Sequence, residues 1–385
     1  MKHKLAFIFF ILLTTILTSC SPTELKIDKS KNIEIEKSKN AMEFIISPGD
    51  PITSTPFVDR GTMYTGLVNG QLFATNVETK KTLWEFNSPE YHIDGLKAFD
   101  SINNFTTDNE KLYFGTSFRL YALDKNTGKL VWKNEIREWV NAAPLVSNGR
   151  VIIGTDNGKI MSIDAYNGKV IWEISTQKKL GVRSVIKESN GNIFVYANDG
   201  LLYSIDEIEG KVNWIYRTHL ADNDWSKNQI GSLLLTSPII SENHIYFGSW
   251  DGYFYAVNES TGRLVWEKNT NGYISTFPIK VEDTLYFSND ATSFALNAKS
   301  GNVIWSRKVG NSSINTAFVY HKEKLIYGVQ NKIITLSAIT GDLITEKEIN
   351  YKGGKDYVKL ISKFDQTIYF TTISRPGVLS FEKLE

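Results

Sequence analysis

Hydrophobic and polar positions alternate in short segments along most of the chain. In residues 120–132 (LYALDKNTGKLVW), LYAL alternates as a β-strand, Asp124 to Gly128 are typical of a tight turn, and KLVW begins a second strand. An Asx side chain can accept backbone amides two residues ahead, and glycine takes the left-handed position of such a turn. This segment, called the frame below, therefore predicts the inner part of a β-hairpin.

The frame recurs in seven copies at spacings of 39 to 52 residues. The copies lie at residues 72–84, 120–132, 160–172, 202–214, 254–266, 293–305 and 333–345. A period near 40 residues with several short strands in each copy is typical of a β-propeller.

Each repeat divides into four strands, and the short second strand, which usually ends in a small residue, occurs eight times. The last unit, 357–385, shows three strand patterns and no fourth. Residues 41–47 (AMEFIIS) have the pattern of a strand without a repeat of their own, so we expect them to complete the last blade and close the ring. The sequence predicts an all-β, eight-bladed β-propeller, with seven blades as the alternative.

Two repeated residue sets could be taken for ligand sites, but the repeat itself explains them better. Six frames end in Trp, which we expect to pack between blades. Six frames open their turn with Asp or Asn, which we expect to cap the turn rather than bind calcium, since each lies in a different blade. These residues are Trp84, Trp132, Trp172, Trp214, Trp266 and Trp305, and Asn76, Asp124, Asp164, Asp206, Asn258 and Asn297.

The first 19 residues are typical of a secretory signal peptide. Lys2 and Lys4 precede an apolar run, 5–17, that would span only about 20 Å as a helix, short of a hydrocarbon core of roughly 30 Å. Residues 17–20 (LTSC) resemble the lipobox of bacterial lipoproteins, in which the cysteine is acylated and becomes the new N-terminus. Cys20 is therefore the candidate lipidation site, and several acyl chains would give a stable membrane anchor. The alternative is an ordinary leader with an incidental cysteine.

The polar segment after the cysteine predicts a second region. Residues 21–41 are rich in Lys, Glu, Ser and Asn and lack an apolar face, so we expect a flexible tether. The predicted organisation is a signal peptide (1–19), a lipidated N-terminus with its tether (20–41) and a single propeller domain (42–385).

Composition excludes several classes of function. Basic and acidic residues number 43 and 42, which gives no support to nucleic-acid binding. Cys20 is the only cysteine, so the chain can form neither an internal disulfide nor a cysteine-based zinc site. The five histidines are scattered, and the chain contains no HExxH, phosphate-binding loop or GxSxG motif. We therefore predict no metal, no cofactor and no catalytic residue.

The repeat of about 40 residues, which occurs in eight units and carries the frame in seven of them, resembles the repeat of quinoprotein-type propellers. One branch of that class comprises dehydrogenases, far longer chains that bind pyrroloquinoline quinone with calcium. The other is the family of outer-membrane assembly lipoproteins called BamB, which share a lipidated cysteine, a polar tether and one eight-bladed domain of this length. That second resemblance implies a scaffold in the machinery that folds β-barrel proteins into the outer membrane.

The BamB resemblance also implies partner-binding residues. In that family a Leu-x-Leu-Arg sequence in the loop that opens the fourth blade contacts the barrel subunit, and this chain has Leu180, Val182 and Arg183 in the corresponding loop. An exposed Leu and Val beside an arginine would suit an interface. The family also uses two acidic residues before the fifth blade, where Asp222 and Asp224 are the candidates, although residues 225–234 are inserted after them.

The sequence thus favours a lipid-anchored, non-enzymatic scaffold that binds a subunit of the β-barrel assembly machinery. We expect it on the outer membrane facing the periplasm, or on the cell surface if the host has one membrane. Two alternatives are a propeller that binds carbohydrate or another small ligand, and a dehydrogenase dependent on pyrroloquinoline quinone.

Overall fold

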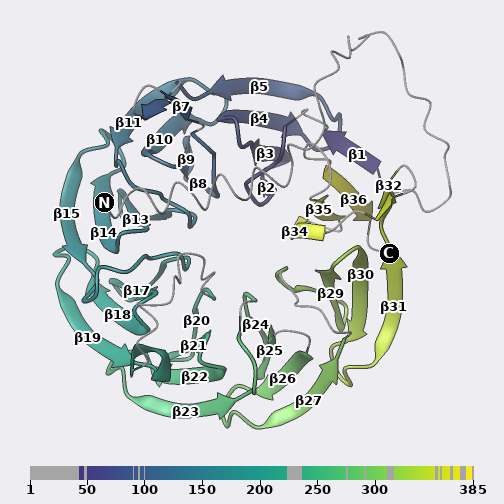
Figure 1. Ribbon diagram of the computed structural model, residues 1–385. Coiled ribbons are helices and arrows are strands. Elements are labelled where there is room, and N and C mark those ends of the chain that lie inside the picture. Colours follow the sequence, from purple (N-terminus) through teal and green to yellow (C-terminus); the bar gives the residue numbers. More distant parts are fainter. Residues whose placement is uncertain are drawn as a thin grey trace. The chain divides into compact units, whose positions relative to one another are not determined.

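The repeats form four-stranded antiparallel sheets that follow one another around a ring (Figure 1). The computed structural model describes residues 43–46, 50–89, 91–93, 96–98, 100–222, 236–274, 276–289, 292–309, 316–351, 354–355, 358–364, 367–372 and 379–383. Within these residues the strands make eight such sheets, which confirms the prediction of eight blades over the alternative of seven. Residues 42–385 form one compact unit.

The first four blades take their strands from consecutive stretches of the chain. Blade 1 contains β2 (Phe57–Asp59), β3 (Thr62–Gly66), β4 (Gln71–Asn76) and β5 (Thr82–Asn87). Blade 2 contains β8 (Phe105–Thr107), β9 (Lys111–Gly115), β10 (Arg119–Asp124) and β11 (Leu130–Glu135). Blade 3 contains β12 (Leu145–Ser147), β13 (Arg150–Gly154), β14 (Lys159–Asp164) and β15 (Val170–Ser175). Blade 4 contains β16 (Lys187–Ser189), β17 (Asn192–Tyr196), β18 (Leu201–Asp206) and β19 (Val212–Arg217).

The next three blades repeat this order. Blade 5 contains β20 (Ile239–Ser241), β21 (His244–Gly248), β22 (Tyr253–Asn258) and β23 (Leu264–Asn269). Blade 6 contains β24 (Ile279–Val281), β25 (Thr284–Asn289), β26 (Thr292–Asn297) and β27 (Val303–Lys308). Blade 7 contains β28 (Val319–His321), β29 (Lys324–Val329), β30 (Lys332–Ser337) and β31 (Leu343–Glu348).

Blade 8 joins the two ends of the propeller. It contains β34 (Val358–Phe364), β35 (Thr367–Thr372), β36 (Leu379–Lys383) and, as its fourth strand, β1 (Glu43–Ile46). The pairing of β1 with β36 is antiparallel, with Glu43 opposite Phe381. The predicted closure of the ring by the N-terminal strand is therefore confirmed.

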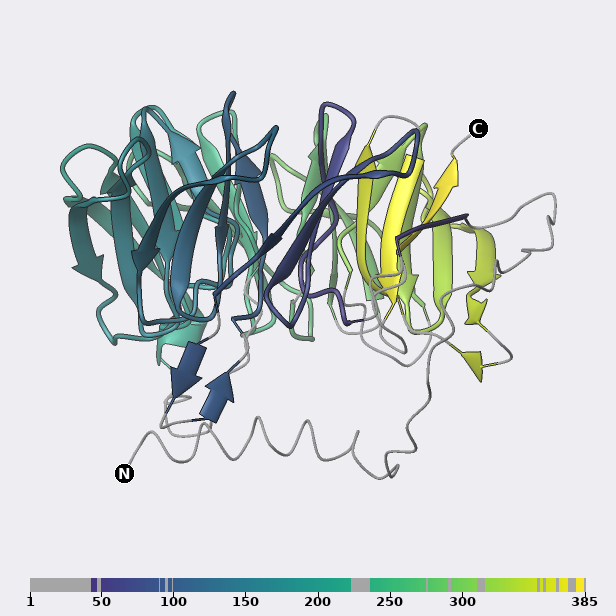
Figure 2. The same ribbon diagram turned by 90° about the horizontal axis from the view of Figure 1, so that it is seen from above.

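The connections between blades carry three further elements. They are the hairpin of β6 (Tyr91–Ile93) with β7 (Leu96–Ala98), the 3-10 helix η1 (His219–Asp222), and the hairpin of β32 (Asn350–Tyr351) with β33 (Gly354–Lys355). All three lie on the same side of the ring, below it in Figure 2.

The frame folds as its sequence predicts. In blade 2, Oδ1 of Asp124 accepts hydrogen bonds from the amides of Asn126 and Thr127 at 3.1 and 2.8 Å. Gly128 follows with a φ of 70°, in the left-handed region that favours glycine. The turn then leads into β11. The capping role expected for Asp124 is confirmed, as it is at the corresponding residues of the other five frames.

The frame also joins each of blades 1 to 6 to the blade that follows it. The indole of Trp84 in blade 1 donates to the carbonyl of Lys125 in blade 2 at 3.0 Å, and five more frame tryptophans make the same bond at 2.9 to 3.1 Å. A Cβ added to the frame glycine of the following blade would lie 2.5 to 2.7 Å from that indole. The tryptophans are therefore packing residues between blades, as predicted.

The hydrophobic core lies between the blades rather than within one of them. One cluster combines Tyr113 and Trp132 of blade 2 with Val151 and Ile163 of blade 3, and similar clusters fill other junctions. Apolar residues of the second and third strands form these clusters because both faces of those strands are covered by neighbouring blades.

Candidate partner-binding face

The two faces of the ring differ in what they carry. The turns between first and second strands and the frame turns lie on one side, which we call the frame face. The turns between second and third strands and the connections between blades lie on the other, which we call the connection face (Figure 2). The predicted loop 177–184 and η1 both belong to the connection face.

Val182 is buried at the junction of blades 3 and 4, contrary to the prediction that it is exposed at an interface. Its exposed fraction is 0%. A Cβ added to Gly154, the last residue of β13, would lie only 2.5 Å from the Cβ of Val182. The side chain thus fills a space that only glycine leaves open, and it cannot take part in a surface contact.

The role of Val182 is a feature of the repeat. A buried β-branched residue just before or at the start of the next first strand packs against the small residue that ends a second strand. The pairs are Ile102 with Gly66, Val140 with Gly115, Val182 with Gly154, Ile274 with Gly248 and Val358 with Gly328. We call these buried β-branched residues wedges. Aligning the repeats on the wedge and glycine positions would have identified Val182 as a buried residue from the sequence.

Arg183 points to a carboxylate of its own chain. Its Nε and Nη2 donate to Oδ1 and Oδ2 of Asp156 at 2.9 and 2.6 Å, a two-pronged ion pair. Asn141 also donates to Oδ1 of Asp156, at 2.7 Å. The side chain of Arg183 is 14% exposed and that of Asp156 is 21% exposed, so the pair is mostly covered and only its edge reaches the surface.

Leu180 lies beside this pair in the same connection and is half-buried. Its carbonyl accepts a hydrogen bond from the hydroxyl of Thr176 at 3.0 Å, which fixes the backbone of the loop. Three residues of this loop were predicted to bind the partner. Leu180 and Arg183 are partly exposed and stay candidates, whereas Val182 is fully buried and does not.

Asp222 ends η1 on the connection face between blades 4 and 5. Its Oδ1 accepts from the Nε of Arg217 at 2.7 Å, and both side chains are more than half exposed. His219, at the start of η1, lies 3.2 Å from Glu267 of β23 through its Nε2. Asp224 lies outside the described residues, and so does the insertion 225–234.

Cys20, the signal peptide and the tether also lie outside the described residues. In the part of the chain that is described, no helix is long and apolar enough to cross a membrane. The same residues contain no cluster of three or more His, Cys, Asp or Glu side chains that could hold a metal ion.

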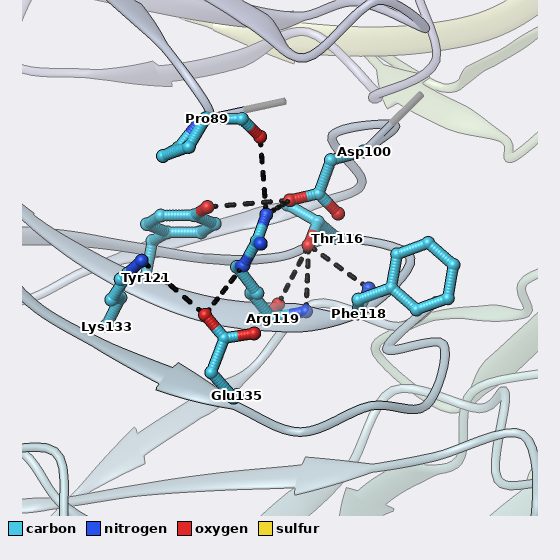
Figure 3. Close-up of polar contacts among 8 residues, drawn as sticks. All are labelled: Pro89, Asp100, Thr116, Phe118, Arg119, Tyr121, Lys133 and Glu135. Atoms are coloured by element: carbon cyan, nitrogen blue, oxygen red, sulfur yellow. Dashed lines mark hydrogen bonds and ion pairs between the residues drawn. The ribbon is translucent and has the colours of Figure 1, made fainter. Parts of the chain in front are cut away.

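A buried ion cluster in blade 2 was not expected from the sequence (Figure 3). Arg119 of β10 donates to Asp100 and to Glu135, each at 2.9 Å, and to the carbonyl of Pro89 at 3.3 Å. Its side chain is only 7% exposed and that of Asp100 only 1%. Pro89 and Asp100 stand on either side of the β6–β7 hairpin, so Arg119 ties both ends of this insertion to blade 2.

Electrostatics favour the charged forms of Arg119 and Glu135. Burial alone would lower the pKa of the Arg119 guanidinium, but the hydrogen bonds to Glu135 and Asp100 raise it above its usual value. Burial raises the pKa of Glu135, but the hydrogen bond and charge of Arg119 lower it by more. The pKa of Glu135 therefore lies below its usual value. Since the guanidinium is enclosed, the cluster stabilises the connection and does not present a binding group. The spacing of its members carries no motif by which the sequence could have predicted it.

Comparison with known proteins agrees with this architecture. Ring, blade number and repeat define the class of quinoprotein-like propellers. The family model described as outer membrane protein assembly factor BamB matches residues 95–226 and 218–367, so the chain belongs to that family.

Individual relatives fall into the two expected branches. The outer membrane protein assembly factor BamB of Moranella endobia is 21% identical over 289 residues, 73% of this chain and 74% of that protein. The dehydrogenase subunit of the quinone alcohol dehydrogenase of Gluconacetobacter polyoxogenes is 36% identical over 143 residues, 32% of this chain and 19% of that protein. The chain thus matches only about a fifth of the length of such dehydrogenases.

The fold has a solved counterpart. The crystal structure of BamB from Moraxella catarrhalis superposes with a TM-score of 0.72 and 19% sequence identity, covering 89% of this chain and all of that one. At this identity the likeness concerns the fold alone.

Proposed function

We propose that this protein is a lipid-anchored, non-enzymatic scaffold that binds a subunit of the β-barrel assembly machinery at the outer membrane. The observation that carries the proposal is membership of the BamB family over most of the propeller, together with a BamB relative that matches nearly three quarters of both chains. Dehydrogenase relatives match a shorter stretch of this chain and a small part of their own.

The site we assign to the partner is the part of the connection face around Leu180 and Arg183. A rigid ring presents this loop, and the hydrogen bond from Thr176 and the ion pair with Asp156 fix its two ends. A preorganised loop loses little conformational entropy on binding. Asp222 and Asp224 belong to the proposal as a second contact, on the neighbouring connection.

Co-purification tests the partner site. We expect the wild-type protein to co-purify with the barrel subunit of the same cell's assembly machinery, and the double variant Leu180→Ala, Arg183→Ala to lose it. The control is Arg150→Ala, since Arg150 begins β13 at the frame face of the same blade. Loss of co-purification in the control as well, or its persistence in the double variant, would remove this loop from the site. Asp222→Ala tests the second contact in the same assay.

Fractionation tests the anchor and the location. Wild-type protein should incorporate labelled palmitate and sediment with outer membranes. The Cys20→Ala variant should incorporate none and appear in the soluble periplasmic fraction. Palmitate incorporation by Cys20→Ala would disprove lipidation at this residue.

The dehydrogenase matches leave one competing activity to measure. If the propeller binds pyrroloquinoline quinone, adding the cofactor with calcium should raise the melting temperature of the purified protein. We expect no shift and no quinone-dependent oxidation of alcohols.

A further inference from the structure

One turn of the connection face joins the loop of Arg183 to the preceding connection. Residues 155–158 link β13 to β14. The amide of Asp156 donates to the carbonyl of Trp139 at 3.0 Å, while the carboxylate of Asp156 binds Arg183. Nδ2 of Asn157 donates to Glu138 at 2.6 Å. The turn therefore holds the connections 136–144 and 176–186 side by side.

Asp156 gathers donors from both connections. Two hydrogen bonds come from Arg183 and one from Asn141, so the orientation of the guanidinium is set by a group that is itself fixed. Arg183 differs from Asn103, Asn141 and Ser275, which follow the buried residues Ile102, Val140 and Ile274, whereas Lys359 follows Val358.

Trp139 stands out on the same surface. Trp139 is 39% exposed, although its neighbours in the chain, Ile136 and Val140, are buried. The backbone is thus anchored on both sides of a large aromatic residue that remains partly exposed. Tryptophan and arginine are the residues most enriched among those that dominate the binding energy of protein interfaces.

We propose that the partner-binding surface extends from Arg183 across the turn 155–158 to Trp139, and that Asp156 is the positioning residue for Arg183. This inference rests on the function proposed above. The occupant is a folded domain of the barrel-assembly subunit that offers an apolar pocket or side chain to the indole and a carbonyl or carboxylate to the guanidinium edge that Asp156 leaves open. The two anchors are presented without rearrangement, because the turn already fixes both connections.

Site-specific crosslinking tests the position of Trp139. We expect Trp139→p-benzoylphenylalanine to form a crosslink with the purified barrel subunit under light. The same substitution at Tyr166 should form none, since Tyr166 is 83% exposed on the frame face of blade 3. Equal crosslinking from both positions, or none from position 139, would overturn the proposal.

Affinity measurements test the energetic role of both residues. Trp139→Ala should weaken binding of the purified subunit by about tenfold or more. Tyr273→Ala, which removes an aromatic ring of 47% exposure from the connection between blades 5 and 6, should change it less than about twofold. A melting curve for each variant checks that the propeller remains folded.

A double-mutant cycle separates positioning from folding. Asp156→Asn should weaken binding in the wild-type background and have no further effect once Arg183 is Ala, because the two act as one unit. Arg183→Lys keeps the positive charge but cannot donate two parallel hydrogen bonds to Asp156. This variant should bind the subunit as weakly as Asp156→Asn. Additive effects would overturn the positioning role.

Different outcomes would disprove the proposed function and the extended surface. If the wild-type protein does not bind the subunit at all, the proposed function is wrong. If it binds but Trp139→Ala and Asp156→Asn bind equally well, the proposed function stands and the extended surface is disproved.

Discussion

The frame face of this propeller repeats the same contacts from blade to blade, whereas the segments of the connection face differ from one another. On the frame face six of the eight blades repeat the same contact, in which a tryptophan packs on the next blade's glycine and bonds to its backbone. On the connection face the segments differ in length and content, with a hairpin after blade 1, η1 after blade 4 and a second hairpin after blade 7.

Two neighbouring residues show what this difference means. Val182 belongs to the repeat, since it is one of several buried residues between blades, whereas the next position varies from unit to unit and in this loop is Arg183, which is only partly covered. Repeated residues close the ring because every junction must be filled in the same way. Residues that occur once are not needed for that purpose, so binding functions can reside there.

The largest effect should come from breaking a repeated junction. Val182→Asp places a carboxylate without a partner in a fully buried position and should lower the free energy of unfolding by about 3 kcal/mol or more. Val131→Asp is the matched control, because Val131 is 45% exposed on β11 and should lose about 1 kcal/mol or less. Urea unfolding measures both, and equal losses would contradict the junction role.

A smaller effect should separate the frame contact from backbone strain. Gly210 and Gly61 both have a left-handed backbone, with φ of 69° and 78°. Alanine at either position should cost about 1 to 2 kcal/mol for the backbone. Only at Gly210 would the new Cβ meet an indole, 2.6 Å from Trp172, which should add about 1 to 3 kcal/mol. Similar unfolding free energies for Gly210→Ala and Gly61→Ala would show that the indole contact is unimportant.

The smallest effect concerns two aspartates whose environments differ between the faces. Burial raises the pKa of Asp199, in the turn between β17 and β18, although hydrogen bonds from Tyr203 and the amide of Leu201 act against it. The hydrogen bonds from the hydroxyl and amide of Thr127 lower the pKa of Asp124 in the frame of blade 2. The protonated form is therefore favoured by folding at Asp199, and the ionised form at Asp124.

These shifts predict pH dependences of opposite sign. The contribution of Asp199 to stability is complete below the ordinary carboxyl pKa of about 4 and is lost as pH rises through the raised value. That of Asp124 is complete above about 4 and is lost as pH falls through the lowered value. Relative to Asp199→Asn the wild type should lose stability between acidic and neutral pH, and relative to Asp124→Asn it should gain. Parallel curves from urea unfolding would contradict the assignment.

The chain by itself determined the features that repeat. Spacing, alternation and turn residues of the frame predicted the strands, the caps such as Asp124, the packing role of Trp84 and its counterparts, and closure of the eighth blade by residues 41–47. These predictions succeed because each depends on local chemistry or on the requirement that every blade packs alike. The resemblance of the repeat likewise led to the right family.

Tertiary structure alone decided which loop residues are accessible. Leu180, Val182 and Arg183 are close in sequence, yet Val182 fills the space above Gly154, a residue of the preceding blade 28 positions earlier. Arg183 meets Asp156 and Asp156 meets Trp139 only because blades 2, 3 and 4 stand side by side around the ring. Burial and pairing of this kind depend on contacts between distant segments, and the pattern along one segment does not contain them.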